Sequence, residues 1–157
     1  MKRRLTTLLI SLGLAVLFLA AAAWPVRAAL GEPADSVASD ETVLAAKRVS
    51  KTVHTGYTVQ ELSADSVTLR EYVAPTGIIF AIAWNGLIHP DLTALLGSYA
   101  GEYRTALQHV PRQHGSRHRK VETHQIVVEK WGQMRNLQGR AYVPALIPSG
   151  VSIDEIK

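Results

Sequence analysis

The chain has 157 residues, with 17 Lys and Arg, 13 Asp and Glu, and no Cys. The absence of Cys excludes disulfide bonds and a lipoprotein anchor, because both require a thiol. A net charge of +4 would favour nucleic acid or an anionic membrane as the partner. Four of the basic residues, however, lie within the first 28 positions, where there is no acidic residue. The remaining charges balance, so we expect no nucleic-acid partner.

The first 28 residues have the three parts of an export signal. Met1 to Arg4 is basic, Leu5 to Ala23 is uncharged and mostly apolar, and Val26-Arg27-Ala28 places small residues where a signal peptidase cuts. We predict cleavage after Ala28 and a periplasmic or secreted product without a membrane span. The alternative is a retained anchor, because a helix over the apolar stretch would be about 28 Å long.

Residues 29–56 are predicted to form an acidic segment that precedes the domain. Four acidic residues and no basic residue lie between Ala29 and Ala46. Ser39 or Asp40 can cap a short helix that ends at Lys47 and Arg48, since acidic side chains favour the first turn of a helix and basic ones the last.

Alternating apolar residues predict three strands, at 57–62, 67–73 and 78–84. The connections are short, and Ala74-Pro75-Thr76-Gly77 has the composition of a tight turn. Short connections between consecutive strands indicate an antiparallel meander. The third strand is apolar on both faces and is therefore expected at the centre of the sheet.

A helix is predicted to begin at Pro90-Asp91, where proline suits the first turn and aspartate the positive end of the helix dipole. Its apolar stripe runs from Leu92 to Leu107 and indicates a helix packed on the core. The opposite side carries only small side chains. They are a candidate docking face for another element or protomer, although packing alone can tolerate such glycines: Ala94, Gly97, Ser98, Gly101 and Thr105.

Two further strands, at 121–131 and 137–143, are predicted to form a C-terminal hairpin. The segment after them contains two prolines and so cannot lie inside a sheet, but it is apolar enough to lie across the core. We therefore predict a single α+β domain over residues 57–157, with an antiparallel sheet of about five strands and one main amphipathic helix on one face.

The segment between the helix and the hairpin is rich in histidine and basic residues. His114 and His118 are four residues apart and are weak candidates for a shared metal ion. Nearby cations would repel a metal, so a solvated loop is the simpler interpretation, and no metal or other cofactor is expected. The same cations are weak candidates for binding an anion, either the acidic segment of this chain or an anionic component of the cell envelope: Arg112, Arg117, Arg119 and Lys120.

No catalytic motif is present in the sequence, and we assign no catalytic residue. Glu71, His89, Asp91 and Ser98 are the polar residues that could come together in a site, but spacing alone does not bring them together. Arg70-Glu71-Tyr72 is interpreted as a solvated strand face. We expect a non-catalytic protein that binds another envelope protein or an anionic envelope component. The alternative is an unrecognised hydrolase or metal-dependent enzyme.

Several motifs resemble an exported bacterial family catalogued as domain of unknown function 2844. They are Ala29-Leu30-Gly31, REYVAPTGIIFAIAWNG from Arg70, PDLTALLGSY from Pro90 and GRAYVPALIPSGVS from Gly139. The resemblance implies an exported single domain and no assigned activity, ligand or catalytic residue. The histidine-rich segment lies outside these motifs.

Overall fold

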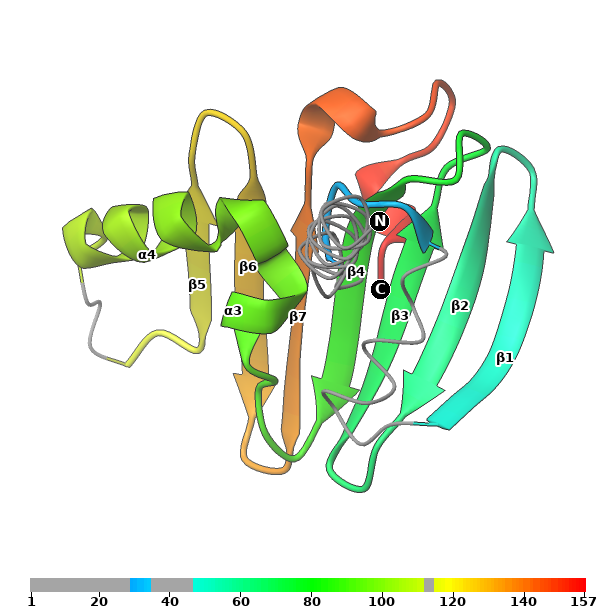
Figure 1. Cartoon of the computed structure of the whole chain (residues 1–157). Coiled ribbons are helices and arrows are strands. Elements are labelled where there is room, and N and C mark those ends of the chain that lie inside the picture. The colour runs from blue at the N-terminus through cyan, green and yellow to red at the C-terminus, as the bar shows by residue number, and fades with distance from the viewer. Residues whose placement is uncertain (1–28, 35–46, 112–114) are drawn as a thin grey trace, which may run out of the picture.

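A seven-stranded antiparallel sheet forms the body of the protein (Figure 1). The computed structural model describes residues 29–34, 47–111 and 115–157. The strands are β1 (Lys47–His54), β2 (Tyr57–Ser63), β3 (Val67–Val73), β4 (Ile79–Gly86), β5 (His118–Glu122), β6 (Val127–Gln133) and β7 (Asn136–Tyr142). Their order in the sheet is β1-β2-β3-β4-β7-β6-β5. A helical segment follows β4 and consists of α3 (Leu92–Leu96), the 3-10 turn η2 (Gly97–Tyr99) and α4 (Ala100–His109).

The predicted α+β class is confirmed, but the prediction of about five strands is wrong because both edge strands were missed. All eight residues of β1 are exposed, so its sequence carries no apolar alternation. Lys47 and Arg48, where we expected a short helix to end, are its first two residues, and the rest of that predicted helix lies outside the described residues. An edge strand buries little surface, and the periodicity on which strand prediction depends is therefore weak.

The second missed strand, β5, comes from the division of a predicted strand into two. A turn at residues 123–126 interrupts the stretch 121–131, and β5 pairs with β6 across it. The Thr123 hydroxyl oxygen accepts hydrogen bonds from the backbone N–H groups of Gln125 (3.3 Å) and Ile126 (3.1 Å). Threonine is known to stabilise turns in this way, so the signal was present in the sequence.

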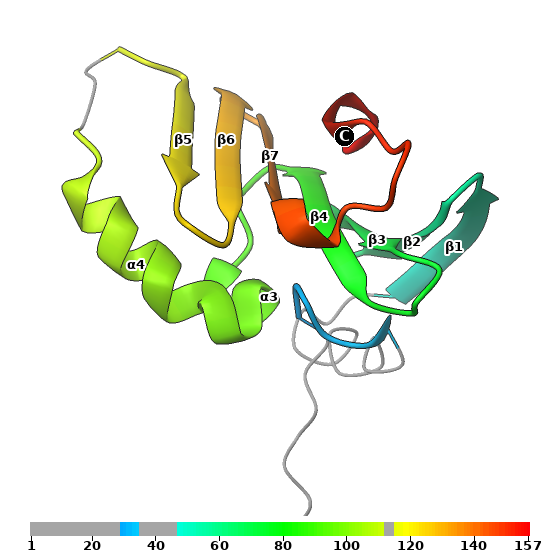
Figure 2. The ribbon, with the colours of Figure 1, turned by 90° about the horizontal axis from the view of Figure 1, so that it is seen from above.

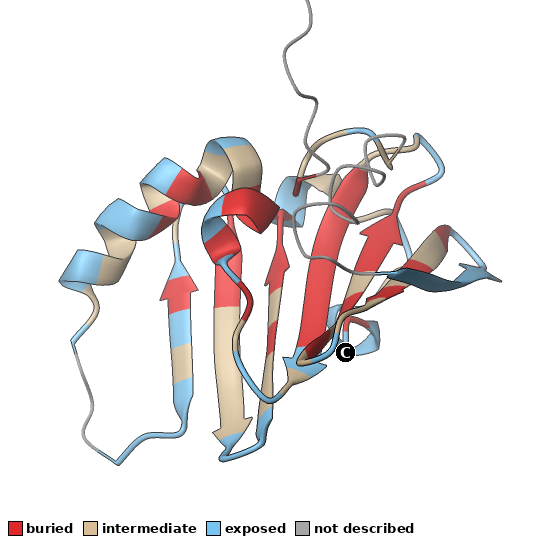
Figure 3. Cartoon of the chain, turned by 60° about the horizontal axis from the view of Figure 1, so that its bottom comes forward, coloured by how far each residue is buried: buried red, intermediate tan, exposed pale blue. Residues whose placement is uncertain are grey.

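The meander and the central position of β4 are confirmed. β2, β3 and β4 are neighbours in the sheet, and β4 is the fourth of the seven strands. The turn before β4 closes with a 2.8 Å hydrogen bond from Gly77 N–H to the Ala74 carbonyl, and Gly77 has a φ of +82°. Six of the eight residues of β4 are buried (Figure 3).

Residues 29–34 are part of the domain. Ala29 and Leu30 are fully buried. The backbone of Gly31 and Glu32 forms hydrogen bonds of 2.8 and 3.0 Å with Ile79 at the start of β4. The acidic segment therefore begins inside the core, and residues 35–46, which connect it to β1, lie outside the described residues.

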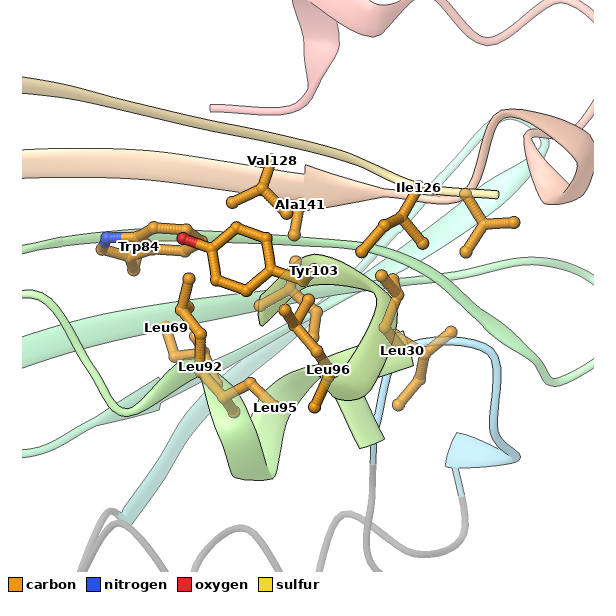
Figure 4. Packing of buried hydrophobic residues seen from close by; sticks show 14 of the residues in the cluster. Leu30, Leu69, Trp84, Leu92, Leu95, Leu96, Tyr103, Ile126, Val128 and Ala141 are labelled. Atoms are coloured by element: carbon orange, nitrogen blue, oxygen red, sulfur yellow. The ribbon is translucent and has the colours of Figure 1, made fainter. Parts of the chain in front are cut away.

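Gly97 interrupts the predicted helix where the chain turns between α3 and α4. Its φ of +51° suits glycine, and a Cβ at this position would lie 2.5 Å from the Ala29 Cβ. The apolar stripe is confirmed, because Leu92, Leu95, Leu96 and Tyr103 are all buried. Figure 4 shows these side chains packed against the sheet.

Each face of the sheet carries its own apolar core, and Figure 2 shows the segments that cover the two faces. On the face that we call the helix face, the helical segment and Leu30 pack on Leu69, Ile82 and Val128. On the opposite face, the segment after β7 packs its Ile156 on side chains that include Tyr72 and Phe80. The two cores together cover both sides of β4.

Polar contacts fasten the C-terminal segment to the opposite face. The Tyr57 hydroxyl donates to the Glu155 carboxylate at 2.8 Å, and the Tyr72 hydroxyl donates to the Lys157 carbonyl at 3.0 Å. Arg140 donates to the Ile153 carbonyl at 2.7 Å. Burial, followed by the hydrogen bond to Glu155, raises the pKa of Tyr57 to about 12.

Gly139→Ala is expected to destabilise the protein by about 1–3 kcal/mol through overpacking. A Cβ on Gly139 would overlap the Trp84 ring and lie 2.6 Å from the Glu129 carbonyl oxygen. The matched control is Gly101→Ala in α4, where the new Cβ meets no atom within 4 Å. This control should stabilise the protein by about 0.5–1 kcal/mol. Equal urea unfolding midpoints for the two variants would contradict the prediction.

Tyr57→Phe is expected to reduce stability more at pH 9 than at pH 11.5. At pH 9 the variant loses a hydrogen bond, which contributes about 1 kcal/mol. The Tyr57 side chain ionises near pH 10 in the unfolded chain and only near 12 in the folded protein. Ionisation therefore favours the unfolded chain first, and the wild type loses stability as the pH rises through this window. Urea titrations at both values test this, and a difference between wild type and variant that does not change with pH would contradict it.

Candidate functional site

The structure does not gather the histidines of the predicted loop into one site. His109 ends α4, where its Nδ1 donates to the Thr105 carbonyl at 2.9 Å. His118 is the first residue of β5, and His124 lies in the turn that follows this strand. His114, the other half of the candidate metal pair, lies outside the described residues. Within residues 29–34, 47–111 and 115–157, no group of three metal-ligating side chains could hold a metal ion.

The predicted basic cluster is divided between the two faces of the sheet. Arg119 lies on the helix face and donates to the carbonyls of Leu107 (3.4 Å) and Val110 (3.5 Å) at the end of α4. The next residue, Lys120, points to the opposite face, because side chains alternate along a strand, and forms a 2.8 Å ion pair with Glu122. Arg117 is exposed in the loop before β5, and Arg112 lies outside the described residues.

The interpretation of Arg70-Glu71-Tyr72 as a solvated strand face is wrong. Glu71 is fully buried and Tyr72 is 3% exposed, because β3 is an inner strand with cover on both faces. Only Arg70 remains partly exposed, in an ion pair of 2.8 Å with Glu61.

The small side chains of the helical segment do not form one docking face. Gly97 is used for the close approach to Ala29, and Ala94 is buried in the domain. Ser98, Gly101 and Thr105 remain exposed, and the Thr105 hydroxyl donates to the Gly101 carbonyl at 3.1 Å. Whether these three residues meet a partner stays a prediction.

A groove on the helix face is a concave region lined by several charged side chains. It has two compartments, which share Arg104 and Leu107. The first has a volume of about 310 Å³ and the second of about 460 Å³, within the usual range for small-molecule sites. The first is lined by Pro90, Asp91, Leu92, Thr93, Ala100, Tyr103, Arg104, Leu107 and Lys130. The second is lined by Arg104, Leu107, Gln108, Val110, Pro111 and Arg119.

We call these two compartments the helix-side groove, and positive charge dominates it. Its basic side chains are Arg104, Arg119 and Lys130, and its one acidic lining residue is Asp91. Among the described residues, no carboxylate forms an ion pair with any of the three cations. The charge of Arg104 helps to lower the pKa of Asp91, and the three cations outnumber this one acidic lining residue.

Three elements, α4, β5 and β6, position these cations. Arg104 follows Tyr103 on α4, at the border of the stripe that packs on the core. Lys130 and Arg119 are opposite each other in the β6–β5 pairing and so lie on the same face. The Lys130 ammonium is 5.7 Å from the centre of the Tyr103 ring, a cation–π distance that holds its side chain against the helix.

His89 lies beside the groove, and its side chain is partly buried. The Trp84 indole N–H donates to His89 Nδ1 at 3.0 Å, so this ring nitrogen is an acceptor. Burial, and secondly the Lys130 charge, lower the pKa of His89 below its ordinary value. A neutral His89 leaves its other nitrogen as a hydrogen-bond donor.

The groove does not assemble the polar residues considered for catalysis. Asp91 accepts a 2.8 Å hydrogen bond from the Thr93 backbone N–H as the cap of α3, which lowers the pKa of its carboxyl group. Neither Glu71 nor Ser98 lines either compartment. The arrangement suits recognition of negative charge better than proton transfer.

A second cavity, of about 370 Å³, lies on the opposite face beside the C-terminal segment. Its central cation, Arg140, is already paired with Glu129 at 2.6 Å and donates to two carbonyls of that segment. These contacts hold the segment in place, and we regard this cavity as structural.

Sequence reasoning missed Arg104 and Lys130. Lys130 follows the buried Val128 by two residues, so the strand period places both on the same face. That signal was available, but the assembly of a site from α4, β5 and β6 depends on the pairing of the strands. Only Arg119 was among the predicted anion-binding residues.

One family model matches the chain, over residues 26–156, and its description is Protein of unknown function (DUF2844). No curated protein and no solved structure matches the chain. The family expected from the sequence motifs is therefore confirmed. In the described part of the chain, no helix has the length and apolar character needed to cross a membrane.

Lys130→Met is expected to raise the pKa of His89 part of the way towards its ordinary value, because it removes the neighbouring positive charge but leaves the burial. NMR titration of the histidine rings measures this change. Lys51→Met, on the exposed strand β1, is the matched control and should leave His89 unchanged. An unaltered His89 titration in Lys130→Met would contradict the groove geometry.

Proposed function

We propose that this chain, which belongs to the DUF2844 family, is an exported protein that binds an anionic ligand in the helix-side groove without chemically changing it. The convergence of Arg104, Arg119 and Lys130 carries this proposal, since none of the three forms an ion pair with a described carboxylate and Asp91 is the one acidic residue of the lining. Arginine presents a planar set of donors that matches carboxylate and phosphate groups, and lysine adds a compact point charge.

The walls of the groove favour a ligand with an apolar part. Leu92, Tyr103 and Leu107 line the compartment that contains Lys130, and Val110 and Pro111 line the neighbouring one. A purely inorganic anion would leave this apolar surface in contact with water. We therefore infer an amphiphile of the cell envelope, with a phosphate, carboxylate or sulfate group attached to an alkyl chain or ring.

Two features of the chain support export. The leading residues have the basic, apolar and small-residue parts of a signal peptide. The family match begins at residue 26, close to the cleavage predicted after Ala28.

Mass spectrometry of the protein from a bacterial periplasm or culture medium should find Ala29 at the N-terminus. Recovery of Met1 on a cytosolic product would contradict export.

Octyl phosphate, below its micelle concentration, is expected to bind with one site per chain, and more tightly than inorganic phosphate or octyl glucoside. Isothermal titration calorimetry measures the three affinities. Arg104→Gln and Lys130→Gln should each weaken binding about tenfold or more, because each removes a charge-assisted contact.

Lys51→Gln is the matched control, because it removes one positive charge from the exposed strand β1. It should bind octyl phosphate as the wild type does. Circular dichroism and thermal unfolding confirm that each variant is folded. Equal affinity of the Lys130→Gln variant and the wild type would overturn the assignment of the groove, as would tighter binding of octyl glucoside.

A further inference from the structure

Exposed aliphatic side chains gather at one end of the sheet. Leu87 and Ile88 are 54% and 55% exposed, and Met134 is 95% exposed. They make up half of the six large hydrophobic side chains that are exposed among the described residues. None of the three belongs to either apolar core, so the fold itself does not require them to be apolar.

Strand pairing brings the loops that carry these side chains together, at the lower end of the sheet in Figure 1. Gly86, which precedes Leu87, pairs with Leu137, and Gln133 pairs with Asn136 across the tight turn that contains Met134. The Asn85 side chain donates to the Asn136 side chain at 3.0 Å. Leu87 is also held in place by a 2.8 Å hydrogen bond from its backbone N–H to the Ser66 carbonyl.

We call this region the loop end, and it comprises residues 64–66, 87–88, 115–117 and 134–135. Basic side chains lie on the same loops as Leu87, Ile88 and Met134 or next to them. Arg117 and Arg135 are exposed on its loops, and the exposed Lys47 pairs with Ser63 directly beside it. The exposed acidic residue among these described loops is Asp65.

We propose that the loop end docks on the surface of an anionic lipid bilayer. Leu87, Ile88 and Met134 insert at the boundary between headgroups and acyl chains, and Lys47, Arg117 and Arg135 meet the headgroup phosphates. Membrane-surface binding of this kind combines buried apolar area with the electrostatic attraction of basic residues to anionic lipid. The proposal goes beyond ligand binding in the helix-side groove and does not require it.

The shape of the loop end favours a bilayer over a protein partner. The three side chains project from two separate loops, and none of the cavities described above includes any of them in its lining. A protein partner would need pockets that match separate tips, because protein interfaces are packed as closely as protein interiors. Lipid is fluid and closes around each tip without such a match.

The absence of Cys from the chain allows the contact to be observed directly. Met134→Cys is labelled with an environment-sensitive NBD fluorophore and mixed with vesicles of phosphatidylcholine and phosphatidylglycerol. The emission is expected to shift to the blue and to increase, and to respond much less to vesicles of phosphatidylcholine alone. The label reports its own surroundings, so a retained N-terminal apolar stretch could tether the protein but would not bury this position.

Val53→Cys with the same label is the matched control. Val53 is 76% exposed on β1 and lies near the turn at the other end of the sheet. Its emission should stay that of a water-exposed probe. Substitution of both Leu87→Ser and Ile88→Ser in the Met134→Cys protein should weaken the vesicle response about fivefold or more, because two apolar contacts are lost.

Three results would overturn the proposal. The first is an unchanged emission at position 134 with anionic vesicles. The second is an equal shift at position 53. The third is a shift at position 134 in concentrated protein without vesicles, which would show that the loop end binds a second copy of the chain. Binding of octyl phosphate in the groove can succeed or fail independently of all three.

Discussion

The need to keep both faces of β4 away from water is the constraint on which the rest of the structure depends. Six of its eight residues are buried, three in the core of each face of the sheet. A single layer of chain can shield only one face of β4 from water. The helical segment and residues 29–34 cover one face, and the segment after β7 covers the other. The hydrophobic effect at a single strand therefore fixes the positions of three segments that are distant in sequence.

The same arrangement explains why the helix-side groove exists and why it is charged. Apolar cover is concentrated at β4 and its neighbours, so the sheet becomes more polar towards β5. α4 extends over this polar region, where its Tyr103 ring contacts Lys130 and the carbonyls at its C-terminal end accept hydrogen bonds from Arg119. Neither Arg119 nor Lys130 forms an ion pair with a described carboxylate, which leaves their charge available to a ligand. The groove is thus formed where the apolar core ends.

The central elements were predictable from the sequence because each carries a strong local signal. The stripe from Leu92 to Leu107 and the apolar run of β4 identified the packed helix and the central strand. The edge strands were not predictable in this way, since β1 is exposed along its whole length. Of the groove, only Arg119 was recognised, because Arg104 and Lys130 resemble ordinary surface residues until the strands are paired.

The sequence by itself determined the α+β class, the antiparallel meander, the family and the balance of charge after residue 28. The family was recognised by its sequence motifs, and the other three depend on composition or on periods of a few residues, which neighbouring positions define. The tertiary structure alone decided that Glu71 is buried, that Arg119 lies beside Lys130, and that Leu87 lies at the same end of the sheet as Met134. These features arise from pairing between distant strands, because burial and the direction of a side chain depend on which strand becomes the neighbour.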